Sequence, residues 1–247
     1  GYLGGRYLSS KWDGMFAEYF KVPDVDLNVA KIPDGVSLEA AALVGDMVTT
    51  GFHGVELADV KFGDRVCVIG IGPVGLMSVV GCVLRGAAEI YAVGHRPVTR
   101  ELAMQYGATA TIDYHDGPIV EQVMKLTGGQ QIEKVIIAGG EPTVFNDALA
   151  LVKYTGTVAN LAGHGRTELL LPIYTNESGF GFCAHKTVTG GLCPGGRRIE
   201  RLMGMVKAGR FEPEKLITHR FYGLDGIEEA FDLMKSKNPE VIKPIIY

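Results

Sequence analysis

The 247-residue sequence lacks the features that mark several classes of protein. It has no apolar run long enough to span a membrane, and nothing near residue 1 is typical of a signal peptide. The cysteines at positions 67, 82, 183 and 193 form no C-x-x-C pair and no metal-type cluster, so we expect reduced thiols in a cytoplasmic protein. The net charge of −4 gives no reason to expect a nucleic-acid or membrane partner.

The composition is that of a globular protein, and the sequence is organised around one glycine-rich stretch. Residues 66–69 (VCVI) form an apolar run that is typical of a buried parallel strand. Gly70, Gly72 and Gly75 follow in the spacing G-x-G-x-x-G. In a dinucleotide site the first glycine permits a tight turn, the second lets a pyrophosphate approach the backbone, and the third allows close packing of helix and strand.

The context of these glycines decides how they are interpreted, because a chain with 34 glycines can match the spacing by chance. The pattern continues as a helix to about residue 85 and as a second apolar strand at residues 90–93. This strand–helix–strand order favours a dinucleotide site over the alternative, a structural turn rich in glycine.

The end of the second strand indicates which dinucleotide is bound. An NAD site usually has Asp or Glu there to hold the ribose 2′-hydroxyl, whereas this chain has Gly94, His95 and Arg96. We expect Gly94 to leave room for a 2′-phosphate and Arg96 to bind it bidentately. The pattern favours NADP over NAD; the alternatives are a solvated Arg96 and a surface His95.

Strands and helices alternate through the middle of the chain. Further strands are predicted at 109–114, 135–138, 156–161 and 186–189, with helices at 97–106, 117–126 and 143–152. The alternation predicts an α/β fold with a doubly wound, parallel, six-stranded Rossmann sheet, and ligands at the carboxyl ends of its strands.

The two ends of the chain do not fit this alternation. Near the start we predict a strand at 15–22, an extended piece at 27–32 and a helix capped by Ser37. Near the end we predict a helix at 198–207, an extended segment at 216–221, a helix at 226–235 and a strand at 241–246. Residues 169–171 stand in a loop-rich stretch, where a short strand and a loop are both left open. Two or three short strands cannot bury a core alone. We therefore expect segments 1–49 and 191–247 to form one additional domain beside a Rossmann domain at 50–190.

Asp46 is an unusual acidic residue, because it lies within a mostly apolar helix that we predict over residues 40–57. We expect Asp46 to be buried among these apolar residues, and a lone buried acid is expected to be paired, hydrogen-bonded or metal-bound. His53 lies two turns away on the same helix, and we interpret it as a packing histidine rather than a second metal ligand. The other histidines considered, at 164, 185 and 219, show no metal-type spacing with Asp46.

Several of these motifs together resemble a known family, the zinc-dependent medium-chain alcohol dehydrogenases, and within it the NADP-linked secondary alcohol dehydrogenases of anaerobic bacteria and protists. The resemblance runs from Gly5 to Ile246. It is carried by residues 45–60, 68–77, 93–97, 106–114, 122–129 and 184–197. It implies a Rossmann domain inserted into a discontinuous, β-rich (GroES-like) catalytic domain, here incomplete, and a homotetramer.

The resemblance also implies roles for individual residues. Asp46 matches a ligand of the catalytic zinc, and Tyr114 would flank the adenosine end of NADP. His95 departs from the usual serine of the 2′-phosphate pocket, which makes that contact weaker or pH-dependent. The implied cofactor-binding residues are Gly70, Ile71, Gly72, Pro73, Val74 and Gly75 at the pyrophosphate, Gly94, His95 and Arg96 at the 2′-phosphate, Leu161, Ala162 and Gly163 beside the nicotinamide, and Lys237 at the phosphates.

The family's other zinc ligands, a Cys and a His-Glu pair, and the Thr or Ser that relays the alcohol proton belong to a segment that would precede Gly1. We therefore expect no zinc-dependent turnover from these 247 residues alone. The expected function is zinc-assisted hydride transfer between small secondary alcohols or ketones and NADP. The alternatives are a non-catalytic NADP(H)-binding protein and a zinc-free enone or quinone reductase; Asp46 and the unpaired strands near the start favour the first reading.

Overall fold

The computed structural model describes residues 14–165, 167–169 and 185–247. The chain divides into two compact units. One unit is Thr50–Leu192, and the other joins the described residues up to Thr49 with Cys193–Tyr247. The units are described one at a time.

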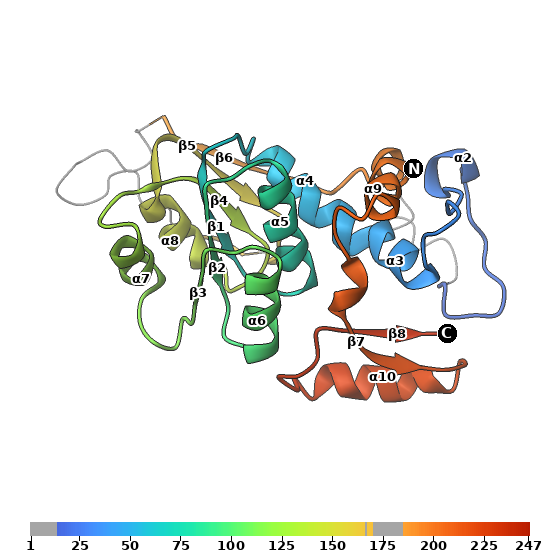
Figure 1. Cartoon of the computed structure of the whole chain (residues 1–247). Helices are drawn as coiled ribbons and strands as arrows, with labels where there is room; N and C mark the ends of the chain where they lie inside the picture. Colours follow the sequence, from blue (N-terminus) through green and yellow to red (C-terminus); the bar gives the residue numbers. More distant parts are fainter. Residues whose placement is uncertain (1–13, 166, 170–184) are drawn as a thin grey trace. The chain divides into compact units, whose positions relative to one another are not determined.

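The unit Thr50–Leu192 contains a single sheet of six parallel strands (Figure 1). The strands are β1 (Arg65–Ile69), β2 (Glu89–Val93), β3 (Ala110–Ile112), β4 (Ile132–Ile137), β5 (Val152–Asn160) and β6 (Thr187–Gly190). Their order in the sheet is β3-β2-β1-β4-β5-β6, which is the doubly wound Rossmann order. The predicted fold class is confirmed, and the glycine-rich loop directly follows β1 at the switch point between β1 and β4.

Helices cover both faces of this sheet. They are α4 (Thr49–Leu57), α5 (Pro73–Leu84), α6 (Pro97–Gln105), α7 (Ile119–Leu126) and α8 (Val144–Leu151). Helices α5 and α6 pack together on one face, and α7 and α8 pack together on the other (Figure 1). Residues 66–69 and 90–93 are consequently buried along their whole length, which explains why these strands read as continuous apolar runs.

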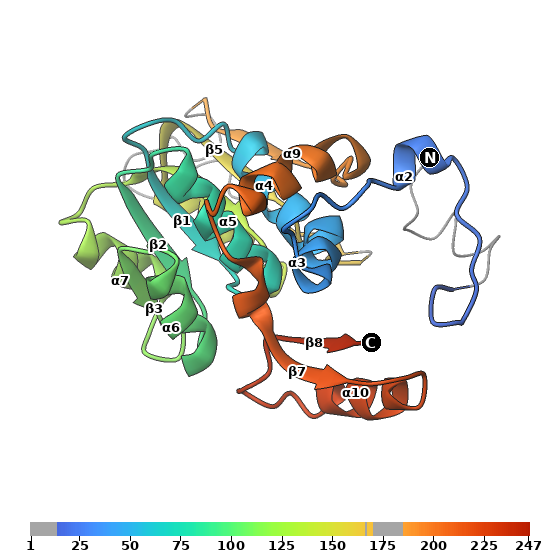
Figure 2. The same ribbon diagram turned by 45° about the vertical axis from the view of Figure 1, so that its right-hand side comes forward.

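The second unit is mainly helical among the residues described. Its elements are α2 (Val25–Asn28), α3 (Leu38–Leu43), the π-helix η1 (Val44–Val48), α9 (Gly196–Lys207), the 3-10 helix η3 (Pro213–Leu216), β7 (Ile217–Phe221), α10 (Gly226–Lys235) and β8 (Lys243–Ile246). Strands β7 and β8 pair in parallel, and α10 connects them (Figure 2). The predicted cap is confirmed, because Ser37 Oγ accepts a hydrogen bond from the Ala40 N–H at 3.0 Å.

Two predictions for this unit are wrong. Residues 15–22 form bends rather than a strand, and residues 25–28 form the short helix α2 instead of an extended piece. A strand needs a neighbour to pair its backbone N–H and C=O groups. Among the described residues of this unit, the strands β7 and β8 pair only with each other. The possible strand at 169–171 falls partly outside the described residues.

No helix in the part of the chain that the structure describes is both long enough and apolar enough to cross a membrane. Cys67 and Cys82 are buried free thiols, and the partly buried Cys193 lies 3.3 Å from the carbonyl oxygen of Thr49, while Cys183 lies outside the described residues.

Candidate functional site

The glycine-rich loop joins β1 to α5 at the carboxyl edge of the sheet, and two of its glycines are required by packing. Gly70 has a φ of +91°, and a Cβ there would lie 2.6 Å from the backbone nitrogen of Gly139, which follows β4. A Cβ on Gly75 would lie 1.9 Å from the carbonyl oxygen of Gly70. These contacts leave room only for glycine, so both positions hold the first turn of α5 against the sheet.

Gly72 differs from its two neighbours in the motif because space opens in front of it. A Cβ at this position would meet only the Nη2 atom of Arg96, at 4.0 Å. Gly72 is the N-cap of α5 and offers no side-chain cap, and Pro73 occupies the first turn. The N–H groups at a helix start attract anions, and here a phosphate can reach them unobstructed. This arrangement fits a pyrophosphate.

Arg96 reaches toward this open space from the end of β2, where it is the N-cap of α6. Its burial lowers the pKa of the guanidinium, and nearby Tyr114 opposes that change. An arginine stays charged at neutral pH in either case, because its ordinary pKa lies above 12. The structure thus places a cation beside the glycine-rich loop, at the strand end where an NAD site would carry an acid.

The lack of a side chain at Gly94 is required by its neighbour Ile71, and the expected room for a 2′-phosphate there stays a prediction. A Cβ on Gly94 would stand 2.4 Å from Cγ1 of Ile71, so the missing side chain makes space for Ile71. Ile71 is buried, and its N–H donates to the carbonyl oxygen of Val93 at 3.2 Å. Gly94 and Ile71 therefore pack against each other between the glycine-rich loop and the end of β2.

Beyond Arg96, three aromatic rings gather at the ends of β2 and β3. Tyr114 Oη is hydrogen-bonded to Nδ1 of His95. The centroids of the His95 and Tyr114 rings are 5.2 Å apart, those of His95 and His115 5.1 Å, and those of Tyr114 and His115 4.5 Å. Sequence reasoning singled out His95 and Tyr114 but missed His115, although its position next to Tyr114 at a strand end was a usable signal.

A second residue that sequence reasoning missed is Asp113, a carboxylate directly before Tyr114. Its Oδ1 accepts hydrogen bonds from the His115 backbone at 3.0 Å, and His115 Nδ1 lies 3.0 Å from the same atom. Arg100 Nη1 lies 3.3 Å from Oδ2. The His115 backbone N–H, with the His115 side chain and Arg100, lowers the pKa of Asp113 despite its partial burial. The negative charge of Asp113 is therefore balanced by partners within the protein.

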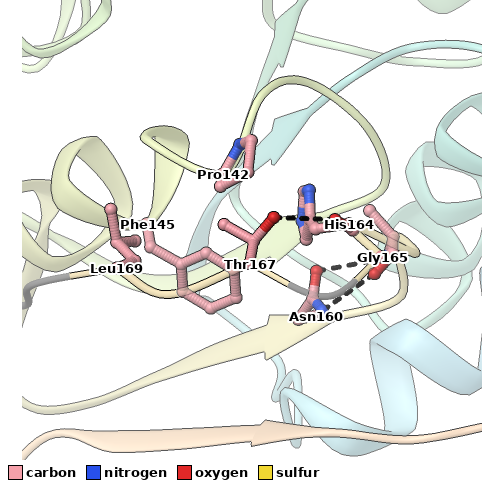
Figure 3. A pocket seen from close by; sticks show the side chains of 8 residues that line it. Pro142, Phe145, Asn160, His164, Gly165, Thr167 and Leu169 are labelled. Atoms are coloured by element: carbon pink, nitrogen blue, oxygen red, sulfur yellow. Dashed lines mark hydrogen bonds between the residues drawn. The ribbon is translucent and has the colours of Figure 1, made fainter.

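The end of β5 lines a cavity of about 460 Å³ on the same edge of the sheet (Figure 3). Its described lining is Pro142, Phe145, Asn160, Ala162, His164, Gly165, Thr167 and Leu169. The Asn160 amide bonds both the N–H and the carbonyl oxygen of Ala162 and so fixes the backbone there.

The three residues expected beside the nicotinamide differ in their surroundings. Ala162 lines the cavity, and Gly163 is exposed with open space around it. The Leu161 side chain packs on Gly54 of α4, because a Cβ on Gly54 would lie 2.5 Å from Leu161 Cδ1. His53, one residue before Gly54, is buried at 8% exposure, which agrees with its interpretation as a packing residue.

Asp46 lies in the other unit, on the π-helix η1 between α3 and α4. The expectation that it is buried is wrong: Asp46 is exposed, while Val44 and Val48 of the same turn are buried. Single π-helical turns occur frequently at functional sites. Among the described residues, no group of three His, Cys, Asp or Glu side chains could hold a metal ion. A catalytic zinc needs about three protein ligands, so the described residues do not make a zinc site by themselves.

Lys237 is also in that unit, exposed in the turn after α10 with a φ of +53°. Its contact with the cofactor phosphates stays a prediction.

Comparisons with known proteins identify the family. Residues 73–207 match the family model described as zinc-binding dehydrogenase. The whole chain is 51% identical to an NADP-dependent isopropanol dehydrogenase of Thermoanaerobacter brockii and 49% identical to one of Clostridium beijerinckii, and it covers 70% of each. This chain belongs to the zinc-binding dehydrogenases. The family resemblance seen in the sequence motifs is thereby confirmed.

Solved structures of this family show the same fold. The zinc-dependent alcohol dehydrogenase 2 of Streptococcus pneumonia superposes with a TM-score of 0.84 at 30% identity, covering 95% of this chain and 65% of that one. The alcohol dehydrogenase TADH of Thermus sp. ATN1 gives a TM-score of 0.82 at 28% identity, covering 94% and 65%. The chain thus spans about two thirds of the length of these zinc-binding dehydrogenases.

Proposed function

We propose that the chain carries the NADP-binding part of a secondary alcohol dehydrogenase, which interconverts small secondary alcohols and ketones. The observation that supports this most is the pairing of Arg96 with the open face of Gly72, at a strand end without a carboxylate. The relatives named as NADP-dependent isopropanol dehydrogenases support the choice of both cofactor and substrate class.

The chain's own residues bind and orient the cofactor. The start of α5 at Gly72 would hold the pyrophosphate, and Arg96 would pair with the 2′-phosphate. Ala162, whose backbone Asn160 holds in place at the end of β5, would face the nicotinamide. Bound NADP supplies the nicotinamide carbon that accepts or donates the hydride.

Asp46 is proposed as one zinc ligand, on the strength of the family resemblance and its exposed place on a π-helical turn. In the protein as its organism makes it, we expect Asp46→Ala to abolish NADP+ reduction by 2-propanol while NADP+ affinity stays within about twofold, since the residue lies outside the cofactor unit. Equal turnover by the variant would remove Asp46 from the reaction. By resemblance, we also propose a cytoplasmic homotetramer, which sedimentation of the purified protein tests.

The cofactor assignment is tested by titrating the protein with NADP+ and with NAD+. NADP+ should bind more tightly. Arg96→Ala should weaken NADP+ binding by about tenfold to a hundredfold and leave NAD+ binding nearly unchanged, because a charge-assisted hydrogen bond contributes roughly 1.5–3 kcal/mol.

Arg85→Ala is the matched control, since it removes the same charge at the exposed far end of α5. It should change neither affinity. Equal affinity of the unmodified protein for the two dinucleotides, or the same loss for both in Arg96→Ala, would contradict the assignment.

A further inference from the structure

The rings of His95, Tyr114 and His115 form a cluster that the cofactor assignment does not use fully. All three side chains are exposed at the carboxyl edge of the sheet, and His95 directly precedes Arg96 in the chain. Each ring lies within 5.2 Å of the other two, centroid to centroid. The imidazoles of His95 and His115 therefore lie near Arg96, the residue proposed to bind the 2′-phosphate.

We propose that His95 and His115 make recognition of the 2′-phosphate proton-linked, so that the protein takes up a proton on His95 when NADP binds. The inference rests on the proposed NADP site. It adds His115 and a proton to the groups that distinguish NADP from NAD.

The hydrogen bond between Tyr114 and His95 explains how a proton can improve phosphate binding. When the His95 ring is neutral and its Nδ1 accepts, the hydroxyl proton of Tyr114 is used within the protein. When His95 is protonated, Nδ1–H donates to Tyr114 Oη instead. The Tyr114 O–H and His95 Nε2–H⁺ are then both free to donate to phosphate oxygens, beside Arg96.

The charged groups near His95 come from two elements of the sheet edge. From α6 the charged neighbours are Arg96 and Arg100, and from the end of β3 they are Asp113 and His115, with Tyr114 between them. The loop from Gly70 to Gly75 contains no titratable side chain. Asp113 is already held by Arg100 and His115, so a bound dianionic phosphate would be the anion left for His95 to meet.

The sign of the pH dependence follows directly. A site that binds a proton together with its ligand binds that ligand more tightly as pH falls. Imidazoles titrate near pH 6.5 in model peptides, so NADP affinity should rise by about tenfold from pH 8 to pH 6. NAD carries no 2′-phosphate, and its affinity should stay level. A phosphate monoester itself takes up a proton near pH 6, so binding should be measured at pH 6 and above.

Calorimetric titration with NADP+ and NAD+ between pH 6 and pH 8 tests this, with each titration repeated in two buffers of different ionisation enthalpy to count protons. The unmodified protein should take up a fraction of a proton with NADP+ and none with NAD+. His95→Asn should abolish the rise in NADP+ affinity toward low pH and leave at most a fall of about twofold near pH 6, where the 2′-phosphate itself takes up a proton. His115→Asn should reduce it partly.

Tyr114→Phe gives a sharper readout. It should weaken NADP+ binding several-fold at pH 6, where the hydroxyl would donate to phosphate, and little at pH 8, where the hydroxyl donates to His95. His185→Asn is the control, because His185 is exposed, precedes β6 at the opposite edge of the sheet, and has a φ of +54° that asparagine tolerates.

Two outcomes overturn the inference: an NADP+ affinity as independent of pH as that of NAD+, or an unchanged pH dependence in His95→Asn. If NADP+ binds tightly through Arg96 at every pH, only the proton linkage fails. If NADP+ does not bind at any pH, the proposed function fails with it.

Discussion

Gly75 faces the carbonyl oxygen of Gly70 so closely that a methyl group at position 75 would lie 1.9 Å from that oxygen. Gly72, between them in the motif, has open space where its side chain would be, with only the Nη2 atom of Arg96 at 4.0 Å. The motif therefore contains glycines of two kinds: Gly70 and Gly75 are required by the fold, whereas Gly72 leaves open space. Substitution should separate them.

Gly75→Ala should destabilise the protein by about 1–3 kcal/mol or more, because the clash is with rigid backbone rather than with a flexible side chain. Urea unfolding followed by circular dichroism measures the loss. Gly204→Ala is the control: this glycine lies in α9 with nothing within 4 Å, and alanine favours a helix by up to about 1 kcal/mol. Equal stability of Gly75→Ala and the unmodified protein would show that α5 does not need this close approach to β1.

Gly72→Ala should have the opposite profile. Its φ of −74° suits alanine, and the added methyl meets no close neighbour, so stability should change by less than about 0.5 kcal/mol. The methyl would, however, occupy the space through which a pyrophosphate approaches the start of α5. NADP+ affinity, measured by fluorescence or calorimetric titration, should fall by about tenfold or more. Full affinity in this variant would place the pyrophosphate elsewhere.

The Rossmann sheet could be predicted from sequence because its signals are local. Apolar runs at residues 66–69 and 90–93 and glycines at fixed spacing determine strand, turn and helix without reference to the rest of the chain. Residues 15–22 show the limit of this reasoning. Their alternating pattern permits a strand, but a strand also needs a partner, and a pattern within one segment does not reveal whether a partner lies beside it.

The site was predicted less completely than the fold, for reasons that particular residues illustrate. Gly94 is two residues before Arg96 in the sequence, but the side chain that occupies the space beside it belongs to Ile71, which follows a different strand. His115 joins the site because the parallel pairing of β2 with β3 brings the ends of the two strands together. Asp46 was expected to be buried from its apolar neighbours, yet the π-helical turn leaves it exposed. Each of these features depends on how segments distant in the sequence pack together or on the exact turn of a helix, and neither can be inferred from a local pattern.

At the amino edge of the sheet, opposite the candidate site, Glu133 of β4 joins two neighbouring strands. Its Oε1 lies 2.8 Å from Lys153 Nζ on β5, and its Oε2 accepts the Arg65 N–H of β1 at 2.9 Å and lies 3.3 Å from Arg65 Nε. Burial opposes the charge, but the hydrogen bonds from Lys153 and Arg65 outweigh it and lower the pKa of Glu133 from its ordinary 4.5 to about 2. A depressed carboxyl pKa stabilises the folded state above the unfolded value, so this contribution is complete above about pH 4.5 and is lost as pH falls toward 2.

Glu133→Gln should therefore lower the free energy of unfolding at pH 7 by about 1–2 kcal/mol, allowing for solvent screening of these partly exposed charges. The difference from the unmodified protein should shrink steadily between pH 4.5 and pH 2, where the native carboxyl also becomes neutral. Urea unfolding at a series of pH values measures it. Glu101→Gln, on the exposed face of α6, should give a difference below about 0.5 kcal/mol at every pH. A difference for Glu133→Gln that stays constant down to pH 2 would mean that the side chain acts through packing rather than through its charge.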